Sequence, residues 1–368
     1  MRDGELHGKD AEQEKHLHLT DGAGKQISVV LRKYRPGEEA GMISCIRDEY
    51  GGSYFKKSFY LPEQIRKESD SGHITFLVVE DSETGRIAGM MILKEFFPEE
   101  SMCEIASQIF RKKYRGYGLA QQFFIYGMEI LMSRNYSAAY CLPVLFHDIT
   151  QRLLYRQGLR ATGFILNVFH MERISHSYPR DRNKKHSQGI QIMAAGKKNA
   201  GTLYLPPEHK DFCEKIYHVL GVSYRLPEVK RWMADHMENE KPAGILALTD
   251  MQWKQDEVQC SLEIRIHKVG RDLSKQIREL HNRYPLIGMQ TANVFLNIND
   301  KNAVWAYRTL VKEGYFFAGL KPLCSDKEYM VLHNAGEIEI FWDDYVMTEE
   351  FKELANYVKK ENGGKRYE

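Results

Sequence analysis

A basic stretch with two glycines stands between segments of two different periodicities. Residues 114–120 read YRGYGLA, the run 102–110 before them is typical of a strand, and 119–134 has the amphipathic spacing of a helix. Glycines allow the backbone to come close to a phosphate, and the first free N–H groups of a helix point toward it. Arg115 adds a fixed positive charge with planar donors. The stretch therefore predicts an anion site with a phosphorylated cofactor as its ligand.

The spacing argues against two common nucleotide sites. A dinucleotide-binding Rossmann turn would read G-x-G-x-x-G, with an acidic residue about 20 positions further on. Gln121 stands where the third glycine belongs, and residues 136–140 contain no acid. The G-K-[ST] of a P-loop is also missing from this stretch.

The pattern that remains, R-x-x-G-x-A at Arg115, Gly118 and Ala120, resembles motif A of the GNAT superfamily of N-acetyltransferases, R/Q-x-x-G-x-G/A. The resemblance implies that the loop wraps the pyrophosphate of acetyl-CoA, the cosubstrate. It also implies that the preceding strand splays from its neighbour, pairs its backbone with the pantetheine, and carries a bulge that frees N–H groups for the acetyl oxygen. The implied cofactor-binding residues are Ile109, Phe110, Arg111, Arg115, Gly116, Tyr117, Gly118, Leu119 and Ala120. The family often has proline at position 112, where this chain has Lys112.

Acetyl transfer to an amine requires a deprotonated amine, donors for the oxyanion, and a proton for the leaving thiolate. By resemblance, Tyr155 is the candidate acid for the thiolate, because it lies three residues before Gly158 at the end of a helix like the family's penultimate one. That helix departs from the family pattern at Asp148, Gln151 and Leu159. The plainer role for Tyr155 is packing under the sheet.

Two residues are candidates for taking the proton from the amine. Glu104 lies on the strand 102–110, as the base does in histone-type family members, but two residues nearer the loop. His147 shares a helix face with Gln151 and titrates near neutrality. Their plainer roles are a solvated strand-end carboxylate and a histidine that lines a helix start. No cluster of histidine, cysteine and acidic residues has metal-ligand spacing, so we expect no metal.

Composition places the chain among ordinary globular proteins. The net charge is +2, so neither the whole chain nor the short basic run 111–115 calls for nucleic acid. No apolar run approaches the ~18 residues of a membrane span, and the first 25 residues lack the apolar core of a secretory signal. Six well-separated cysteines without a C-x-x-C pair indicate free thiols in a reducing compartment. We therefore expect a cytoplasmic protein that binds neither membrane nor nucleic acid.

The length of 368 residues suggests two domains. We expect a flexible tail at 1–25 and a catalytic GNAT domain at 26–198, an α/β (α+β) fold whose mixed, mostly antiparallel sheet is flanked by helices. Its expected strands are 26–34, 73–80, 86–95, 102–110, 137–144, 161–170 and 189–197, and its expected helices are 38–49, one after Pro62, 119–134 and 149–157. The polar segment 172–188 is expected to be a loop that either borders the substrate or is simply solvated, and we favour the solvated loop.

The second half repeats this order of elements. The repetition predicts a degenerate GNAT-like domain at 199–336, followed by a C-terminal extension at 337–368. Its expected strands are 202–205, 243–249, 259–267, 291–298, 315–321 and 329–334, and its expected helices are 207–220, 272–283, 302–312 and 348–360. One local match supports duplication: 158–163 reads GLRATG and 314–319 reads GYFFAG, each after the last helix of its half.

The second half lacks the residues that the first half would use. At the turn that matches the glycine loop, Gly270 is the single glycine and the carboxylate of Asp272 would repel a phosphate. Val311 stands where the first half has Tyr155. We therefore expect only the first half to bind acetyl-CoA.

Two functions fit these observations. The first is an acetyl-CoA-dependent N-acetyltransferase, an acyltransferase that uses direct transfer in a ternary complex. The alternative is a non-catalytic acyl-CoA-binding protein that regulates or binds a partner. Tyr155 and Glu104, which only catalysis needs, favour the first. The acceptor is open among small amines, amino acids, antibiotics and protein lysines, as are the acyl chain length and a homodimer.

Overall fold

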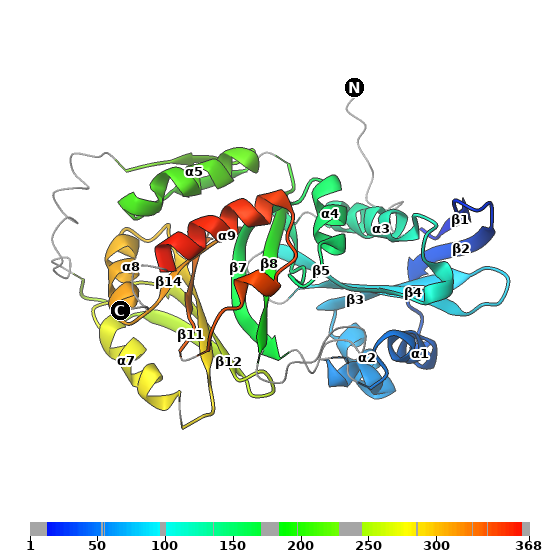
Figure 1. Cartoon of the computed structure of the whole chain (residues 1–368), viewed down its shortest axis with the longest axis horizontal. Coiled ribbons are helices and arrows are strands. Elements are labelled where there is room, and N and C mark those ends of the chain that lie inside the picture. Colours follow the sequence, from blue (N-terminus) through cyan, green and yellow to red (C-terminus); the bar gives the residue numbers. More distant parts are fainter. Residues whose placement is uncertain are drawn as a thin grey trace. The chain divides into compact units, whose positions relative to one another are not determined.

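The computed structural model describes residues 13–362 apart from 53, 55, 96–100, 135, 171–183, 197, 228–244, 285, 326 and 337. The chain forms two compact units. The first unit is Met1–Cys141 with Met171–Arg182, and the second is Leu142–His170 with Asn183–Glu368 (Figure 1).

The first unit is a sheet with helices on both faces. Its strands follow the order β1-β2-β3-β4-β5-β6, and neighbours are antiparallel except β5 and β6, which are parallel. Figure 1 shows α3 on one face of this sheet and α1 and α2 on the other. The elements are β1 (Lys15–Thr20), β2 (Gln26–Lys33), α1 (Glu39–Tyr50), α2 (Pro62–Asp70), β3 (Ile74–Asp81), β4 (Ile87–Lys94), β5 (Met102–Phe110), α3 (Leu119–Ser133) and β6 (Ala138–Cys141), with short 3₁₀ turns at Lys57–Tyr60 and Lys112–Tyr114.

Apolar packing between α1, α2 and the sheet forms the core on one face of this unit. Met42 and Ile46 of α1 lie against Phe76 of β3 and Ile92 of β4, all with their side chains buried. Every residue of β4 is buried, because helices cover both of its faces. This packing fixes the strand that neighbours β5, on which the candidate site depends.

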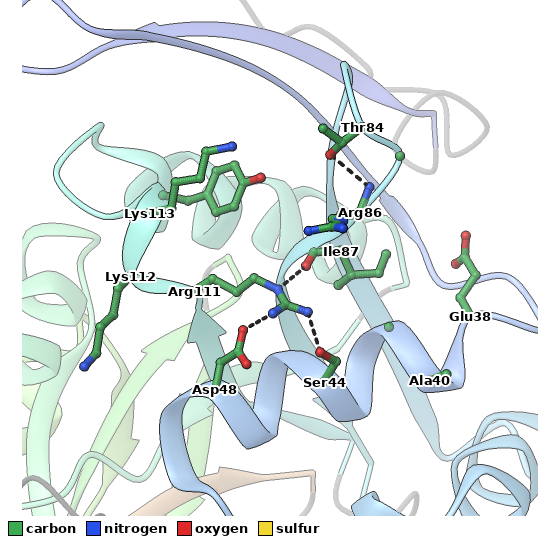
Figure 2. A pocket seen from close by; sticks show the side chains of 13 residues that line it. Glu38, Ala40, Ser44, Asp48, Thr84, Arg86, Ile87, Arg111, Lys112 and Lys113 are labelled. Atoms are coloured by element: carbon green, nitrogen blue, oxygen red, sulfur yellow. Dashed lines mark hydrogen bonds and ion pairs between the residues drawn. The ribbon is translucent and has the colours of Figure 1, made fainter.

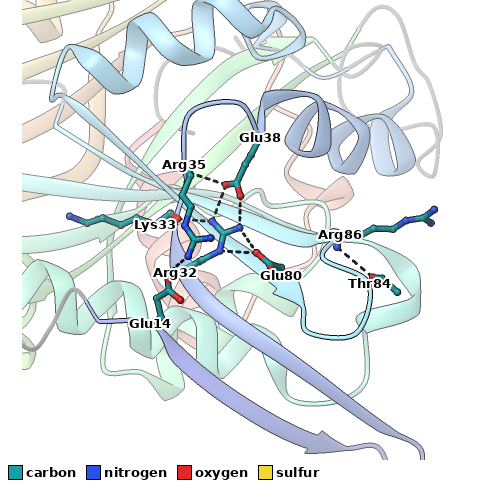
Figure 3. Close-up of polar contacts among 8 residues, drawn as sticks. All are labelled: Glu14, Arg32, Lys33, Arg35, Glu38, Glu80, Thr84 and Arg86. Atoms are coloured by element: carbon teal, nitrogen blue, oxygen red, sulfur yellow. Dashed lines mark hydrogen bonds and ion pairs between the residues drawn. The ribbon is translucent and has the colours of Figure 1, made fainter.

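A buried guanidinium joins β2, β3 and the start of α1 (Figure 3). Arg32 is 2% exposed; its Nη1 donates to Glu38 Oε2 at 2.9 Å and its Nε donates to Glu80 Oε2 at 2.9 Å. Glu38 also accepts the backbone N–H of Arg35 at 2.9 Å. Burial opposes ionisation of Glu38, but the hydrogen bonds from Arg32 and Arg35 outweigh it and lower the pKa of Glu38.

The second unit is built on a sheet of order β8-β7-β14-β15-β13-β12-β11, in which only β12 and β13 are parallel. Helix α9 packs on β7 and β14, and a separate parallel pair joins β9 to β10. The elements are α4 (Ile149–Arg156), β7 (Arg160–His170), β8 (Lys185–Ala194), β9 (Asn199–Thr202), α5 (Lys210–Val219), β10 (Ser223–Arg225), β11 (Asp250–Asp256), β12 (Ser261–Lys268), α7 (Leu273–Arg283), β13 (Thr291–Asn297), α8 (Ala303–Lys312), β14 (Phe316–Cys324), β15 (Lys327–Asn334) and α9 (Glu349–Asn362).

The two matched glycine sequences meet in space. Strands β7 and β14 pair at a single position, Gly163 opposite Gly319. A Cβ on Gly319 would lie 2.6 Å from the carbonyl oxygen of Thr162 and nearer still to Gly163. These glycines end the matched segments 158–163 and 314–319, so the sequence similarity falls where the corresponding strands of the two halves touch. The contact supports a tandem repeat.

The predicted fold class is confirmed: the sheets are mixed, mostly antiparallel, and flanked by helices. The compact units do not coincide with the predicted domain boundaries, because β7 and β8 of the predicted first domain lie in the second unit. The prediction of a duplicated fold with a boundary at 198/199 stays a prediction.

Some expected elements differ from the structure. Residues 15–20, which we placed in a flexible tail, form β1 and pair with β2. The strand expected at 243–249 is absent over 245–249, and 250–256 forms β11 instead. The apolar side chains that suggested the earlier strand, Leu246 and Leu248, are exposed, whereas β11 is a mostly polar strand at the sheet edge. Strand β8 begins at Lys185, inside the expected loop 172–188, of which 172–183 lies outside the described residues.

Candidate active site

The glycine loop presents open backbone before α3. Gly116 and Gly118 have φ angles of 91° and 71°, in the left-handed region that favours glycine. Nothing lies within 4 Å of a Cβ placed on either glycine. The carbonyl of Gly118 accepts the N–H groups of Gln121 and Gln122 at 3.1 and 3.3 Å. These are the first hydrogen bonds of the helix, so the N–H groups before Gln121 are not used within the helix. Residues of this loop therefore fit the phosphates of a CoA molecule.

Strand β5 separates from β6 just before this loop. The two strands pair only from Met102 to Glu104, opposite Ala138 to Tyr140. In the part of the chain that the structure describes, no strand pairs with β5 on this side beyond Glu104. The unpaired edge can accept an extended chain by backbone hydrogen bonding, as the splay implied by the resemblance requires.

A bulge interrupts β5 within this unpaired stretch. Met90 pairs with Ile109 but Ile92 pairs with Ala106, so Ser107 and Gln108 together stand opposite one residue of β4. Ser107 has a φ angle of 53°, which is uncommon for a residue other than glycine. The bulge that the resemblance implied is thus present, and it releases backbone groups from the ladder with β4.

The three residues predicted to pair with pantetheine differ in their backbone directions. Arg111 donates its backbone N–H to Ala88 at 2.9 Å, and Ile109 stands opposite Met90 in the same ladder. Because hydrogen-bonded pairs alternate along antiparallel strands, the backbone of Phe110 points away from β4. The carbonyl of Phe110 accepts a hydrogen bond from the side chain of Arg115 at 2.9 Å. Phe110 is therefore the residue of the three that faces the open edge.

Arg115 is held at the start of the loop. Its Nε and Nη2 donate to the carbonyl of Phe110 at 3.2 and 2.9 Å, and Nη2 also forms an ion pair with Glu49. The side chain is 46% exposed, so its charge remains accessible beside the glycines. The side chains of Tyr117 and Leu119 are buried, so these residues face the loop's ligand with their backbone alone.

A cavity of about 970 Å³ opens beside the loop, between α1, the turn 84–87 and residues 111–114 (Figure 2). Of the predicted cofactor residues it includes only Arg111. The Arg111 guanidinium donates to the carbonyl of Ile87 at 2.8 Å and to Ser44 Oγ at 3.0 Å, and it pairs with Asp48. Its side chain therefore braces α1 against β4.

The carboxylate of Glu104 lies in a buried cluster with two lysines, which we call the Lys56–Lys94–Glu104 cluster. Glu104 is 7% exposed, and its Oε2 lies 3.5 Å from Nζ of Lys94, the residue opposite it on β4. Lys56 lies near enough for the charges of Lys94 and Glu104 to act on it. Burial and the charge of Lys94, opposed by Glu104, lower the pKa of Lys56 to about 7. Glu104 is thus an ion-paired group rather than a solvated strand-end carboxylate.

Tyr54 connects this cluster to the bulge. Its hydroxyl lies 2.6 Å from Ser107 Oγ, and the ring is buried against Phe59.

Tyr155 and His147 belong to the second unit. Tyr155 is 47% exposed on α4, with the guanidinium carbon of Arg160 4.5 Å from its ring centroid. His147 precedes α4, and burial lowers its pKa, so the imidazole is neutral at pH 7. Gln151 is fully buried and has a bracing role: it donates to the carbonyls of Val144, His147 and Val346. The catalytic roles of Tyr155, His147 and Glu104 stay predictions.

The matching turn of the second unit is filled by protein. A Cβ on Gly270 would lie 2.6 Å from the carbonyl oxygen of Leu248 and nearer still to Thr249. The N–H of Gly270 donates to Thr249 Oγ1 at 3.1 Å, and Asp272 accepts the N–H of Thr249 at 2.8 Å. Backbone groups that could hold a phosphate are engaged, which supports the prediction that this turn does not bind CoA.

The sequence predicted neither a metal site nor a membrane-spanning helix, and the described residues can be searched for both. Among them, no group of three or more histidine, cysteine or acidic residues is arranged to hold a metal ion. None of the helices formed by the described residues is long and apolar enough to cross a membrane.

Sequence reasoning missed Lys56, Lys94, Tyr54 and Ser107. One signal was available in the sequence. Lys94 ends an otherwise apolar strand, and Glu104 is the third residue of the next strand, after two apolar residues. A lysine and a glutamate on adjacent antiparallel strands are candidates for a buried pair. Lys56 lies in an irregular segment where no periodicity indicates burial.

Comparisons with known proteins give weak matches to acetyltransferases. No protein-family model matches the chain, and no curated protein matches it. Among solved structures, spermidine/spermine N-acetyltransferase SpeG from Vibrio cholerae matches with 16% identity and a TM-score of 0.38, over 45% of this chain and 94% of that chain. An N-acetyltransferase from Staphylococcus aureus matches with 13% identity and a TM-score of 0.37, over 45% of this chain and 98% of that chain.

At such identities and TM-scores these matches carry no argument, and the fold rests on the geometry of the chain itself. The order of elements from β2 to β8 is the order that the resemblance implied. The resemblance also implied that β5 separates from its neighbour and carries a bulge before the glycine loop, and both features are present. These features agree with the fold that the resemblance to the GNAT superfamily implied.

Proposed function

We propose that the first half of the chain binds acetyl-CoA and transfers its acetyl group to an amine by direct transfer in a ternary complex. The proposal is based on one observation: β5 has an unpaired edge, a bulge at Ser107, and two open left-handed glycines between it and α3. These three features follow one another along a single stretch of chain from Ile105 to Leu119.

Each part of this stretch has a role that its chemistry suits. The N–H groups after Gly118, with the charge of Arg115, would hold the pyrophosphate. Phe110, whose backbone faces the open edge, would pair with the pantetheine, and the bulge at Ser107 would donate to the acetyl oxygen. When bound, acetyl-CoA would supply an activated thioester. Tyr155 would give a proton to the leaving thiolate.

The second half would have a supporting role. Its glycine turn is occupied by residues 248 and 249, and Val311 stands at the position that corresponds to Tyr155. It would therefore stabilise β7 and β8, the last strands of the first half, rather than bind a second cofactor.

Calorimetric titration with acetyl-CoA, and separately with free CoA, tests the proposal. We expect micromolar binding at one site per chain. Arg115→Ala should weaken binding about 10- to 100-fold, since a hydrogen-bonded charge pair contributes roughly 1.5–3 kcal/mol. Arg35→Ala is the matched control, because Arg35 is an exposed arginine paired with Glu14 away from the loop.

Four results would count against the proposal or a part of it. Two sites per chain would mean that the second turn also binds CoA, and equal affinity in Arg115→Ala would remove the site assignment. Absence of binding would refute the acetyltransferase. If CoA binds but Tyr155→Phe leaves turnover unchanged with an acceptor found by screening, the thiolate acid is another group.

A further inference from the structure

The bulge of β5 is held by side-chain contacts that reach outside the strand. Ser107 Oγ lies 2.6 Å from the hydroxyl of Tyr54, which belongs to the segment between α1 and the 3₁₀ turn Lys57–Tyr60. Gln108 Nε2 donates to the carbonyl of Ala120, in the first turn of α3, at 2.7 Å. The two residues that together stand opposite one residue of β4 therefore each have an anchor of their own.

The ring of Tyr54 is packed on two sides. Tyr54 is 4% exposed, and its ring centroid lies 4.8 Å from that of Tyr50 and 6.3 Å from that of Phe59. The backbone N–H of Tyr54 donates to the hydroxyl of Tyr60 at 3.0 Å. Burial raises the pKa of Tyr54, so its phenol stays protonated at physiological pH. The packed ring gives its hydroxyl a fixed position, and Ser107 is hydrogen-bonded at that position.

Ser107 has a backbone conformation that needs support from its surroundings. Its φ angle is 53°, in the left-handed region, which a Cβ makes unfavourable for any residue other than glycine. Ser107 also stands where the ladder between β5 and β4 is interrupted, so this ladder does not fix its backbone. The hydrogen bond to Tyr54 offsets part of the cost and ties Ser107 to a residue of the apolar core.

We propose that Tyr54 is a positioning residue for acetyl transfer, whose hydroxyl holds Ser107 in the left-handed conformation that directs the backbone of the bulge toward the acetyl oxygen. The inference rests on the proposed function, which places the acetyl oxygen at this bulge. Donors that are already oriented need no reorganisation when charge develops on that oxygen, so a fixed bulge stabilises it better than a mobile one. Tyr54 acts through Ser107 and not on the acetyl group itself.

Calorimetric titration of the full chain with acetyl-CoA, and separately with free CoA, tests this inference without a known acceptor. Free CoA lacks the acetyl oxygen, so a change in the ratio of the two dissociation constants reports on the contact with that oxygen. Tyr54→Phe removes the hydroxyl and keeps the ring between Tyr50 and Phe59. This variant should bind acetyl-CoA about 3- to 10-fold more weakly, as expected for one neutral hydrogen bond, and should bind free CoA as the wild type does.

Two variants of Ser107 separate the hydrogen bond from the backbone conformation. Ser107→Ala keeps a Cβ and loses the hydroxyl, so it should reproduce the loss seen in Tyr54→Phe. Ser107→Gly can adopt a positive φ without the cost of a Cβ, so it should keep more of the preference for acetyl-CoA than Ser107→Ala does. In the Ser107→Gly background, Tyr54→Phe should have little further effect.

Tyr34→Phe is the matched control for the loss of a buried phenol. Tyr34 belongs to the same apolar core as Tyr54, and its hydroxyl donates to Glu39 instead of to the bulge. The ratio of the two dissociation constants in Tyr34→Phe should equal that of the wild type.

The two ligands separate the failure of the inference from the failure of the proposed function. If Tyr54→Phe weakens both ligands equally, or neither, Tyr54 has no role at the acetyl group, and the inference is overturned while the CoA site stands. If Tyr54→Phe costs as much in the Ser107→Gly background as in the wild type, the hydroxyl does not act through the conformation of Ser107, and the inference is again overturned. If the wild type binds neither ligand, both proposals are overturned.

Circular dichroism of each variant shows whether it folds before it is titrated. If Tyr54→Phe does not fold, Ser107→Ala decides the outcome, because it removes the same hydrogen bond at a half-buried position. An unchanged ratio of dissociation constants in Ser107→Ala would then overturn the inference.

Discussion

Gly319→Ala should destabilise the second unit more than any ordinary glycine substitution. Gly319 has a φ angle of 117°, which side chains with a Cβ rarely adopt, and its Cα faces Gly163 across the single paired position of β7 and β14. A methyl group here would lie 2.6 Å from the carbonyl oxygen of Thr162, which is inside van der Waals contact. The strands would have to separate or the backbone would have to change conformation.

The expected magnitude has two parts. The left-handed backbone costs a residue other than glycine about 1–2 kcal/mol. Overpacking against fixed backbone costs roughly 1–3 kcal/mol more. Gly319→Ala should therefore lower the free energy of unfolding by about 2–5 kcal/mol. Gly163→Ala should cost less, because its φ is not positive and its nearest neighbours, the backbone N and O of Leu320, lie at 3.0 Å.

Urea unfolding followed by tryptophan fluorescence measures this effect in the relevant unit. All four tryptophans lie within residues 183–368, so the signal reports the second unit. Gly24→Ala is the matched control: Gly24 has a φ angle of 82° with nothing within 4 Å of a Cβ. It carries the backbone cost without the close approach, but it lies in the first unit, so its unfolding is followed by far-ultraviolet circular dichroism.

The order of the three losses decides the outcome. The reasoning predicts that Gly319→Ala loses the most, followed by Gly163→Ala, with Gly24→Ala near 1 kcal/mol. A loss in Gly319→Ala equal to that in Gly24→Ala would show that β7 and β14 are not in close contact. The repeat contact would then have no energetic role.

Two pH dependences follow from one buried and one partly exposed carboxyl group. Burial raises the pKa of Glu328 to about 7 against the hydrogen bonds from Leu323 and Tyr217, so the folded protein binds a proton that the unfolded chain has lost. Stability should fall by about 3 kcal/mol as pH rises from about 4.5 to 7, and urea unfolding of Glu328→Gln should lack this slope. Glu38 has a lowered pKa, so its contribution is present above the unfolded pKa and is lost as pH falls through the folded one. Because Glu38 is partly exposed, Glu38→Gln should cost at most about 1 kcal/mol at pH 7 and nothing at pH 2 in urea titrations followed by circular dichroism.

The first half was predictable from sequence because local signals agreed with the fold. The strand Met102–Phe110 and the helix from Leu119 have the expected bounds, since apolar periodicity and the glycine turn between them point to the same structure. Strands β1 and β11 were missed for the opposite reason. Each is a polar strand at a sheet edge, and only pairing with its neighbour gives it a defined conformation.

The site was predictable where it depends on the backbone and not where it depends on side chains that meet in space. The glycine conformations and the bulge follow from the motif and its resemblance to a family. The ion pair of Glu104 with Lys94 does not, because these two residues meet through the register of β4 and β5. Their effects on one another require burial, which a sequence pattern of isolated charges does not indicate.

Two features of the second half, a retained glycine and a filled turn, support the same role, which is to stabilise β7 and β8. It has kept the glycine at 319, whose contact with Gly163 joins the repeat to β7. It has filled the turn at Gly270, where an open backbone would otherwise have to be solvated or bound to a ligand. Helix α9 adds Phe351, fully buried against Phe164 of β7. Strands β7 and β8, which a GNAT-like fold needs to complete its first half, are thus packed by residues from the second half, and cutting the chain after residue 198 would expose them.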